Sequence, residues 1–466
     1  MKNSVQSVDK NKLVPPDGGW GYIVTVSIIV SQYATVVPLT SFGILYGPFM
    51  ASIGDEKSGI SMLISTFVAV SSLTGFVSSF LLRKYTTRMT GLIGATCYFI
   101  GYCIEIFGTT FSHMLVCFGF IKGFGYGLLT PSLHTTMNNY FSKKLNLMMG
   151  ISQAVTSVGT VMSPPMAIYL MENLGFKKTL GVFAGFSILN FPAVATFRNV
   201  EKYQQIQTSA TSSGVAVAAV PSHAHPETQV EPLLQSNGEK LVISMKSRKN
   251  NISSTILTIK NWLLDTIGLR LLGNMEYINM AVVLSLPFVT DGIFLSLINT
   301  ILNNMDFKSS EIALMMMIYF FFDVLSKLLY SALSGFYVIN NRNIFLVSAL
   351  CIALFRIAFI LIEGHTWRKV VMGLIGISKG FQETSLPLVI SSGYKEDFST
   401  AYSLYMVISG ISFLLIGSLI SYLSNQTQND STIIYVLAVI NFVTCFTWIS
   451  ERIFERLFTR KSPDAL

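Results

Sequence analysis

The sequence predicts an all-α membrane protein in which twelve transmembrane helices form two six-helix halves. Of its 466 residues, 51% are hydrophobic and only 12% are charged, which is too apolar for an ordinary water-facing surface. Runs long enough to cross a bilayer, about 20 apolar residues each, recur in two groups of six that a polar stretch separates. The expected solvent for both groups is therefore a lipid bilayer.

The six runs of each group set the expected domain boundaries. The first group comprises Trp20 to Tyr46, Ser58 to Leu82, Thr90 to Gly108, His113 to Met137, Leu147 to Leu170 and Leu180 to Phe197. The second comprises Ile278 to Leu302, Ile312 to Phe336, Asn343 to Ile362, Val370 to Ser392, Ala401 to Leu423 and Thr432 to Ile449. The chain is therefore expected to consist of a tail (1–19), a first bundle (20–197), a linker (198–275), a second bundle (276–450) and a final tail (451–466).

The linker has two parts of different composition. Residues 208–240 are polar and of low complexity, which predicts disorder because such a segment cannot bury enough apolar area to fold alone. Residues 241–272 are basic and amphipathic. This second part suits either a helix lying on the membrane face or an extension of the seventh span.

Lys and Arg residues predict the orientation, because positive segments are retained on the cytoplasmic side. Twelve spans place on one side the N-terminal tail, the linker, Arg83, Lys84, Arg88, Lys143, Lys144, Arg452, Arg456, Arg460 and Lys461. Both termini are then cytoplasmic, and the glycosylation sequons at Asn425 and Asn429 fall on the opposite face. The net charge of +8 therefore indicates orientation and not a nucleic-acid partner.

The sequence contains no pattern typical of an enzyme or of a cofactor. The five cysteines lie in apolar runs without metal-ligand spacing, so we expect packing roles for them. The glycine-rich stretch 119–127 also lies in an apolar run, which favours helix packing over phosphate binding. No enzymatic activity, cofactor or metal is therefore expected.

An internal repeat supports a duplicated architecture. Lys122-Gly123-Phe124 in the fourth run is followed by Pro131, and Lys379-Gly380-Phe381 in the tenth by Pro387. The fourth and tenth runs are equivalent in a six-plus-six duplication. Transporters built from such halves bind their substrate near the membrane midplane, between the halves.

Two motifs resemble the signatures of the monocarboxylate transporter family, which are solute carriers of the major facilitator superfamily. One is segment 15–22, PPDGGWGY, and the other is segment 140–145, YFSKKL, which continues through Gly150, Ala154 and Gly159. The resemblance implies the major facilitator fold, transport by alternating access, a small-molecule substrate and, as in some members, an accessory single-span membrane protein. The residues expected to act as structural or gating elements are Asp17, Gly18, Gly19, Trp20, Tyr140, Phe141, Lys143, Lys144 and Gly150.

Ionisable residues inside the spans are the candidate site, since each costs roughly 2.5 to 3.5 kcal/mol on insertion scales. The set expected to bind substrate or couple protons is Asp323, Lys327, Lys122, Lys379, Glu383 and Asp291. Spacing of four residues places Asp323 with Lys327, and Lys379 with Glu383, on one helix face each. For Arg356 we expect a buried structural pair, and for His134 an interfacial position. Mutual neutralisation is the structural alternative for Asp323 and Lys327.

The eighth span departs from the family it resembles. The family carries an Asp and, four residues later, an Arg that are implicated in proton coupling and substrate binding, whereas Asp323 is followed by Lys327. Lysine is a point charge and lacks the planar fork of arginine. The lysine that proton-coupled lactate carriers have in span one is also absent from Val37-Pro38-Leu39-Thr40-Ser41.

The sequence thus predicts a multi-pass transporter of small organic anions such as monocarboxylates, which we expect in the plasma membrane. Secondary active transport, including proton symport, and facilitated diffusion both stay open. The alternatives are a proton-independent facilitator of amino acids or other small metabolites, and a membrane sensor or scaffold that does not transport.

Overall fold

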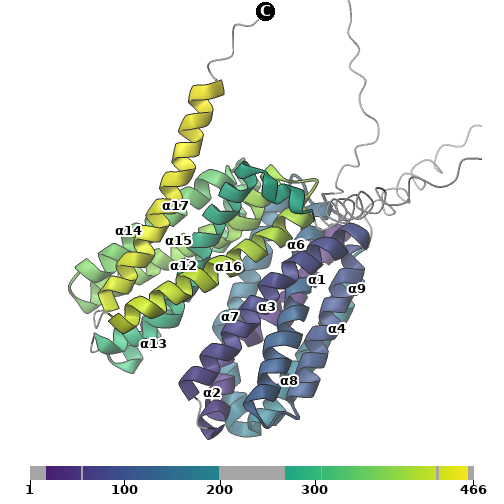
Figure 1. The fold of residues 1–466 in the computed structure, drawn as a ribbon, viewed down its shortest axis with the longest axis vertical. Helices are drawn as coiled ribbons and strands as arrows, with labels where there is room; N and C mark the ends of the chain where they lie inside the picture. The colour runs from purple at the N-terminus through teal and green to yellow at the C-terminus, as the bar shows by residue number, and fades with distance from the viewer. Residues whose placement is uncertain (1–16, 54–55, 199–267, 306, 427–429, 460–466) are drawn as a thin grey trace, which may run out of the picture.

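The computed structural model describes residues 17–53, 56–198, 268–305, 307–426 and 430–459. The segment predicted to be disordered, most of the basic stretch after it, and Asn429 lie outside these residues. The described chain forms two helical halves, which Figure 1 shows in purple to blue for the first and in green to yellow for the second.

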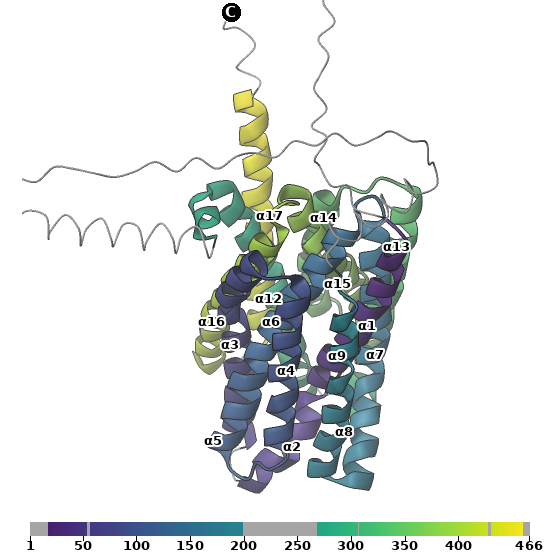
Figure 2. The same cartoon turned by 90° about the vertical axis from the view of Figure 1, so that its right-hand side faces the viewer.

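The helices follow the expected six-plus-six order. The first half contains α1 (Trp20–Thr40), α2 (Phe42–Ile53), α3 (Glu56–Lys84), α4 (Thr87–Glu105), α5 (Phe111–Met114), η1 (Leu115–Lys122), α6 (Gly123–Tyr140), α7 (Leu145–Leu174), α8 (Phe176–Ile188) and α9 (Asn190–Ala195). The second contains η2 (Leu269–Gly273), α12 (Met275–Asn304), α13 (Ser309–Phe336), α14 (Asn341–Leu361), α15 (His365–Gly393), α16 (Phe398–Gln426) and α17 (Asp430–Thr459). Figure 2 shows the helices of the first half running side by side.

Ten helical stretches in the described residues are long and apolar enough to cross a membrane. The third and tenth predicted spans, which form α4 and α15, are not among these ten. They are nevertheless helices of 19 and 29 residues, and they pack against α6 and against α13 and α14, respectively. With α4 and α15, the bundle has the predicted twelve-span fold.

The first predicted span is two helices and not one. α1 ends at Thr40, two residues after Pro38, and α2 begins at Phe42. Proline interrupts helical hydrogen bonding because it has no N–H group. At the break, the Ser41 N–H bonds to the Pro38 carbonyl and not to that of Val37. The Ser163 hydroxyl of α7, 2.5 Å from the Ser41 hydroxyl, donates to the Val37 carbonyl at 2.6 Å in its place.

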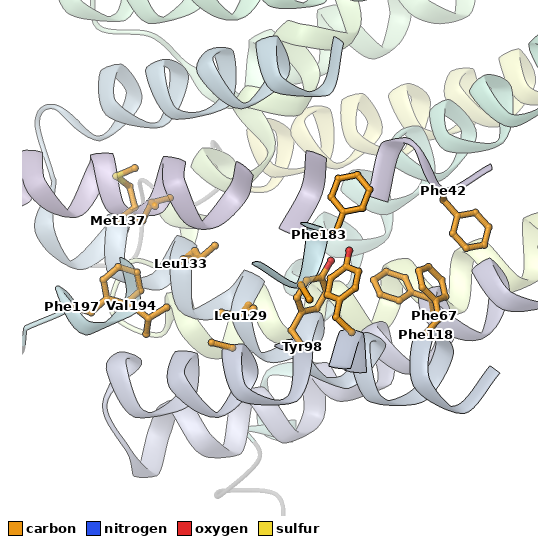
Figure 3. Packing of buried hydrophobic residues seen from close by; sticks show 14 of the residues in the cluster. Phe42, Phe67, Tyr98, Phe118, Leu129, Leu133, Met137, Phe183, Val194 and Phe197 are labelled. Carbon is orange, nitrogen blue, oxygen red and sulfur yellow. The ribbon is translucent and has the colours of Figure 1, made fainter. Parts of the chain in front are cut away.

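Most of each half packs around apolar residues of its own. In the first half, Phe42, Phe67 and Phe118 form an aromatic group between α2, α3 and η1, with the Phe42 and Phe118 rings 4.7 Å apart (Figure 3). Phe183 of α8 belongs to the same cluster. Most of the core of each half is therefore its own, although Tyr330 and Leu388 of the second half also join the cluster of the first.

The halves meet at the end where the first half finishes and the second begins, which we call the linker end. It contains Arg83, Tyr140, Arg198, Gly268 and Tyr394. There, the Arg83 Nε atom donates to the Thr400 hydroxyl at 2.8 Å, across the two halves. Figure 1 shows the halves approaching each other toward this end and diverging toward the opposite end, near the labels of α2 and α13.

Candidate functional site

Four charged side chains from two helices meet in the second half. Lys327 Nζ of α13 lies 3.0 Å from Asp323 Oδ2 and 2.8 Å from Glu383 Oε2 of α15. Lys379 Nζ of α15 lies 3.1 Å from the same Glu383 oxygen and 3.6 Å from Asp323 Oδ1. We call these four residues the midplane charge cluster. With two lysines and two carboxylates ionised, its net charge is zero.

Close packing of α13 on α15 brings the cluster together. A methyl group at Gly380 would lie 2.6 Å from the Asp323 carbonyl oxygen, so no larger residue fits there without a shift. The spacing of four residues had predicted each same-helix pair. The ion pair between Lys327 and Glu383 joins the two helices, and this cross-helix contact could not be read from spacing.

The cluster is buried unevenly and reaches the first half. The side chains of Asp323 and Lys327 are each 2% exposed, that of Lys379 is 15% exposed, and that of Glu383 is 33% exposed. Lys327 Nζ also donates to the Ser157 hydroxyl of α7 at 2.6 Å. A cation of the second half is therefore bonded directly to the first half at the boundary between them.

A second charged group lies beside the cluster. Asp291 of α12 pairs with Arg356 of α14 at 3.1 Å and accepts a hydrogen bond from the Tyr319 hydroxyl at 3.2 Å. The Arg356 guanidinium also lies 4.7 Å from the Phe294 ring centre. Lys379 Nζ lies 5.8 Å from the Tyr319 ring centre, so Tyr319 separates this pair from the midplane charge cluster. Arg356 thus forms the buried pair expected of it.

Lys122 lies apart from the cluster, inside the first half. Its Nζ atom is 2.8 Å from Glu105 Oε2 and 3.7 Å from the Tyr102 ring centre, and the Tyr46 hydroxyl donates to Glu105 Oε1 at 2.5 Å. Lys122 and Glu105 are 1% and 0% exposed. Glu105 was not among the predicted site residues, although an acidic residue within the apolar run 90–108 is a signal that points to it.

His134 is buried and not interfacial. Only 6% of it is exposed, and its ring centre lies 4.8 Å from that of Tyr402 on α16. Its position near the end of α6 suggested contact with the membrane surface. The second half covers that position instead, which hydropathy alone does not reveal.

The two signature segments meet at the linker end. The Asp17 carboxylate accepts hydrogen bonds from the backbone N–H groups of Ser142 at 2.7 Å and Lys144 at 3.2 Å. Partial burial raises the pKa of Asp17, but these backbone donors, that of Lys143 and the charge of Lys395 outweigh it and leave the pKa below its ordinary value. Asp17 therefore holds the turn before α7 as an anion.

Aromatic and glycine contacts complete this junction. Phe141 packs over Gly21, where an added methyl group would lie 2.8 Å from the ring, and Lys144 Nζ donates to the Tyr22 hydroxyl at 2.8 Å. On α7, a methyl group at Gly150 would lie 2.8 Å from Ser331 Cβ of α13. The second signature thus contacts the first signature on one side and the second half on the other.

Known proteins resemble this chain in sequence and fold. A profile of the Major Facilitator Superfamily matches residues 24–250. Monocarboxylate transporter 13 of Rattus norvegicus is 26% identical over 175 residues, which are 37% of this chain and 41% of the rat protein. Monocarboxylate transporter 7 of Homo sapiens is 27% identical over 175 residues, 38% of this chain and 33% of the human protein. The matched segment thus spans less than half of either relative.

Two solved structures extend the similarity of fold to 92% of this chain. The proton:xylose symporter XylE has a TM-score of 0.68 at 9% identity, with 95% of its chain covered. The transporter FucP in the outward conformation has a TM-score of 0.61 at 12% identity, with 98% covered. The chain thus resembles the Major Facilitator Superfamily over residues 24–250, resembles monocarboxylate transporters over part of its length, and shares the fold of solved transporters over 92% of it.

Proposed function

We propose that the protein transports small organic anions, monocarboxylates or related metabolites, across the membrane by alternating access. The observation that carries this proposal is the position of Lys327. It is a buried cation at the boundary of the halves, bonded to Ser157 of the first half and to two carboxylates of the second. A substrate carboxylate that replaces one of these partners is held between the two halves.

The charge balance of the site favours proton coupling. An anion added to a neutral buried cluster leaves one uncompensated negative charge, which is unfavourable in a medium of low dielectric constant. One proton taken up by Asp323 or Glu383 restores neutrality. The membrane potential, worth about 2.3 kcal/mol per charge per 100 mV, then does no work. A pH gradient supplies about 1.4 kcal/mol per unit.

Two alternatives have their own support. Lys327 replaces an arginine of the related family, and the partly exposed Glu383 carboxylate suits an amino group, which favours a proton-independent facilitator of amino acids. A sensor or scaffold would use the long linker and not the buried charges. For the transporter and for both alternatives, we propose a plasma-membrane location with both termini in the cytoplasm.

The test is uptake of a labelled panel of lactate, pyruvate, aromatic amino acids and neutral sugars into expressing cells at pH 6 and pH 7.5. We expect lactate or pyruvate to enter faster at pH 6, and Lys327→Ala to abolish that uptake while reaching the cell surface normally. The change removes the cation without adding bulk, so a loss of transport reports on anion binding.

Other outcomes select the alternatives. Uptake of an amino acid that is indifferent to pH and survives Lys327→Ala would replace the anion proposal with the facilitator. If no member of the panel enters, and signalling changes on removal of the linker but not on Lys327→Ala, the sensor is favoured.

A further inference from the structure

The two acids of the midplane charge cluster differ in how they are held. Asp323 is 2% exposed and lies one helical turn before Lys327 on the same helix, so the two side chains move together. Glu383 comes from α15, and its side chain is 33% exposed. Of the two carboxylates, Glu383 is the one that solvent reaches and the one that can separate from Lys327 without moving α13.

The contacts of Glu383 involve only one of its oxygens. Lys327 and Lys379 both bond to Oε2, at 2.8 and 3.1 Å, and all hydrogen bonds that the described residues make to this carboxylate end on that atom. The other oxygen, Oε1, is therefore available to accept a proton. A monocarboxylate carries the same carboxylate group and can accept a hydrogen bond from Lys327 in its place.

We propose that Glu383 occupies the substrate's place on Lys327 when the site is empty, and that it leaves when it takes up a proton. This inference rests on the proposed anion transport and assigns the proton to one of the two candidate acids. The proton from solvent binds Glu383 Oε1, the Lys327 and Lys379 contacts to Oε2 weaken, and the substrate carboxylate replaces Oε2 on Lys327. Before and after the exchange the site contains two cations and two anions.

Charge-assisted hydrogen bonds explain why protonation and release are linked. An ionised carboxylate holds two lysines far more strongly than a neutral acid does. An anion can therefore displace Glu383 easily only when Glu383 is protonated. Asp323, 3.0 Å from Lys327 on the same helix, keeps that lysine in position throughout the exchange.

The acids and lysines that face Glu383 are all more enclosed than Glu383 itself. α13 contributes Asp323 and Lys327, and α15 contributes Lys379. In the described part of the chain, the other titratable side chains that interact with Glu383 are Tyr126 of α6, Tyr402 and Tyr405 of α16, and Asp291 of α12, which is paired with Arg356 of α14. Tyrosines are neutral at physiological pH, so the pH dependence is assigned to the exposed carboxyl group.

Glu383→Gln tests the inference, because glutamine has the shape of the protonated acid and cannot ionise. We expect its rate of labelled lactate or pyruvate uptake at pH 7.5 to rise to that at pH 6, so that the ratio of the two rates falls to about one. Glu311→Gln is the matched control, because it neutralises an acid at the start of α13, at the end of the bundle opposite the linker end. It should keep the wild-type ratio of uptake at pH 6 to uptake at pH 7.5.

Binding provides the second measurement if Glu383→Gln is stable but does not transport. Lactate and pyruvate should then raise the melting temperature of the purified variant equally at pH 6 and pH 7.5, whereas the wild-type protein should respond more at pH 6. A variant that keeps the wild-type pH dependence, in uptake or in this thermal shift, overturns the inference and leaves the proposed function intact. A wild-type protein that moves no anion at either pH rejects the proposed function itself.

Discussion

Lys122 and Lys379 occupy equivalent places in the internal repeat but have different surroundings. Lys122 pairs with Glu105 and lies among Tyr46, Tyr102 and Phe118, at 1% exposure. Lys379 shares Glu383 with Lys327 and is 15% exposed. The same residue in the duplicated position is thus fully enclosed in one half and part of the candidate site in the other. We therefore expect Lys122 to contribute to stability, and Lys379 stays a proposed residue of substrate binding or its control.

The enclosed pair leads to a stability prediction. Lys122→Met or Glu105→Gln alone leaves a buried charge without its partner, and breaking such a pair typically costs about 3 to 5 kcal/mol. The double variant removes both charges, so we expect it to recover most of the loss. Melting temperatures of the purified proteins in detergent measure the effect.

The partly exposed pair Arg342 and Glu451, with side chains 26% and 19% exposed, provides the comparison for this cycle. Removing one of its members should lower the melting temperature much less, because solvent screens the charge that remains. If the double variant lowers the melting temperature by the sum of the two single losses, the charges of Lys122 and Glu105 do not depend on each other.

At the scale of the helix, the turn before α7 depends on a residue far away in sequence. Asp17 has a φ of 46°, in the left-handed region, and its carboxylate bonds to backbone groups at the start of α7. Asparagine tolerates that backbone conformation but has no charge. Asp17→Asn therefore isolates the contribution of the negative charge at the helix N-terminus.

The lowered pKa of Asp17 fixes the sign of the pH effect. A carboxylate whose pKa is depressed by folding stabilises the protein fully above its ordinary value of 3.8, and loses that contribution as the pH falls through the folded value. We expect Asp17→Asn to be less stable by about 1 kcal/mol from pH 7 to pH 5. The difference should shrink only below about pH 4. Thermal unfolding across this range is the measurement, and a gap that already closes between pH 7 and pH 5 would contradict the assignment.

Hydropathy predicted the helices well because each span must be apolar by itself. The predicted run 312–336 lies within α13 (Ser309–Phe336), for example. The break at Ser41 was not predicted, since the Ser163 hydroxyl that satisfies it comes from another helix. The site shows the same contrast between contacts within one helix and contacts between helices. The spacing of four residues predicted the pair of Asp323 and Lys327, but no pattern in the sequence places Glu383 or Ser157 beside that lysine.

For the whole molecule, the closed linker end depends on small residues where the halves touch. A methyl group at Gly75 of α3 would lie 2.8 Å from Val407 Cγ2 of α16 and closer still to the Ser403 carbonyl oxygen. Added bulk at a backbone contact cannot be relieved by a side-chain rotation. Gly75→Ala should therefore disfavour this closed state by about 1 to 3 kcal/mol.

Such a shift changes the population of the closed state by roughly fivefold to 150-fold, and we expect the maximal uptake rate of Gly75→Ala to fall accordingly. Gly181→Ala on α8, where an added methyl group meets nothing within 4 Å, is the matched control. Equal uptake rates for the two variants at equal surface expression would show that this contact does not limit transport.

The bond between Lys327 and Ser157 has a consequence for the direction of net flux. In the empty protein it ties the halves together through the same lysine that is proposed to bind the solute. An unloaded carrier must break that tie with no solute on Lys327, whereas in a loaded carrier the solute carboxylate on Lys327 offsets the loss of the bond. Exchange of one solute for another across the membrane should then be faster than net uptake. The concentration of solute on the trans side would limit the rate of the cycle.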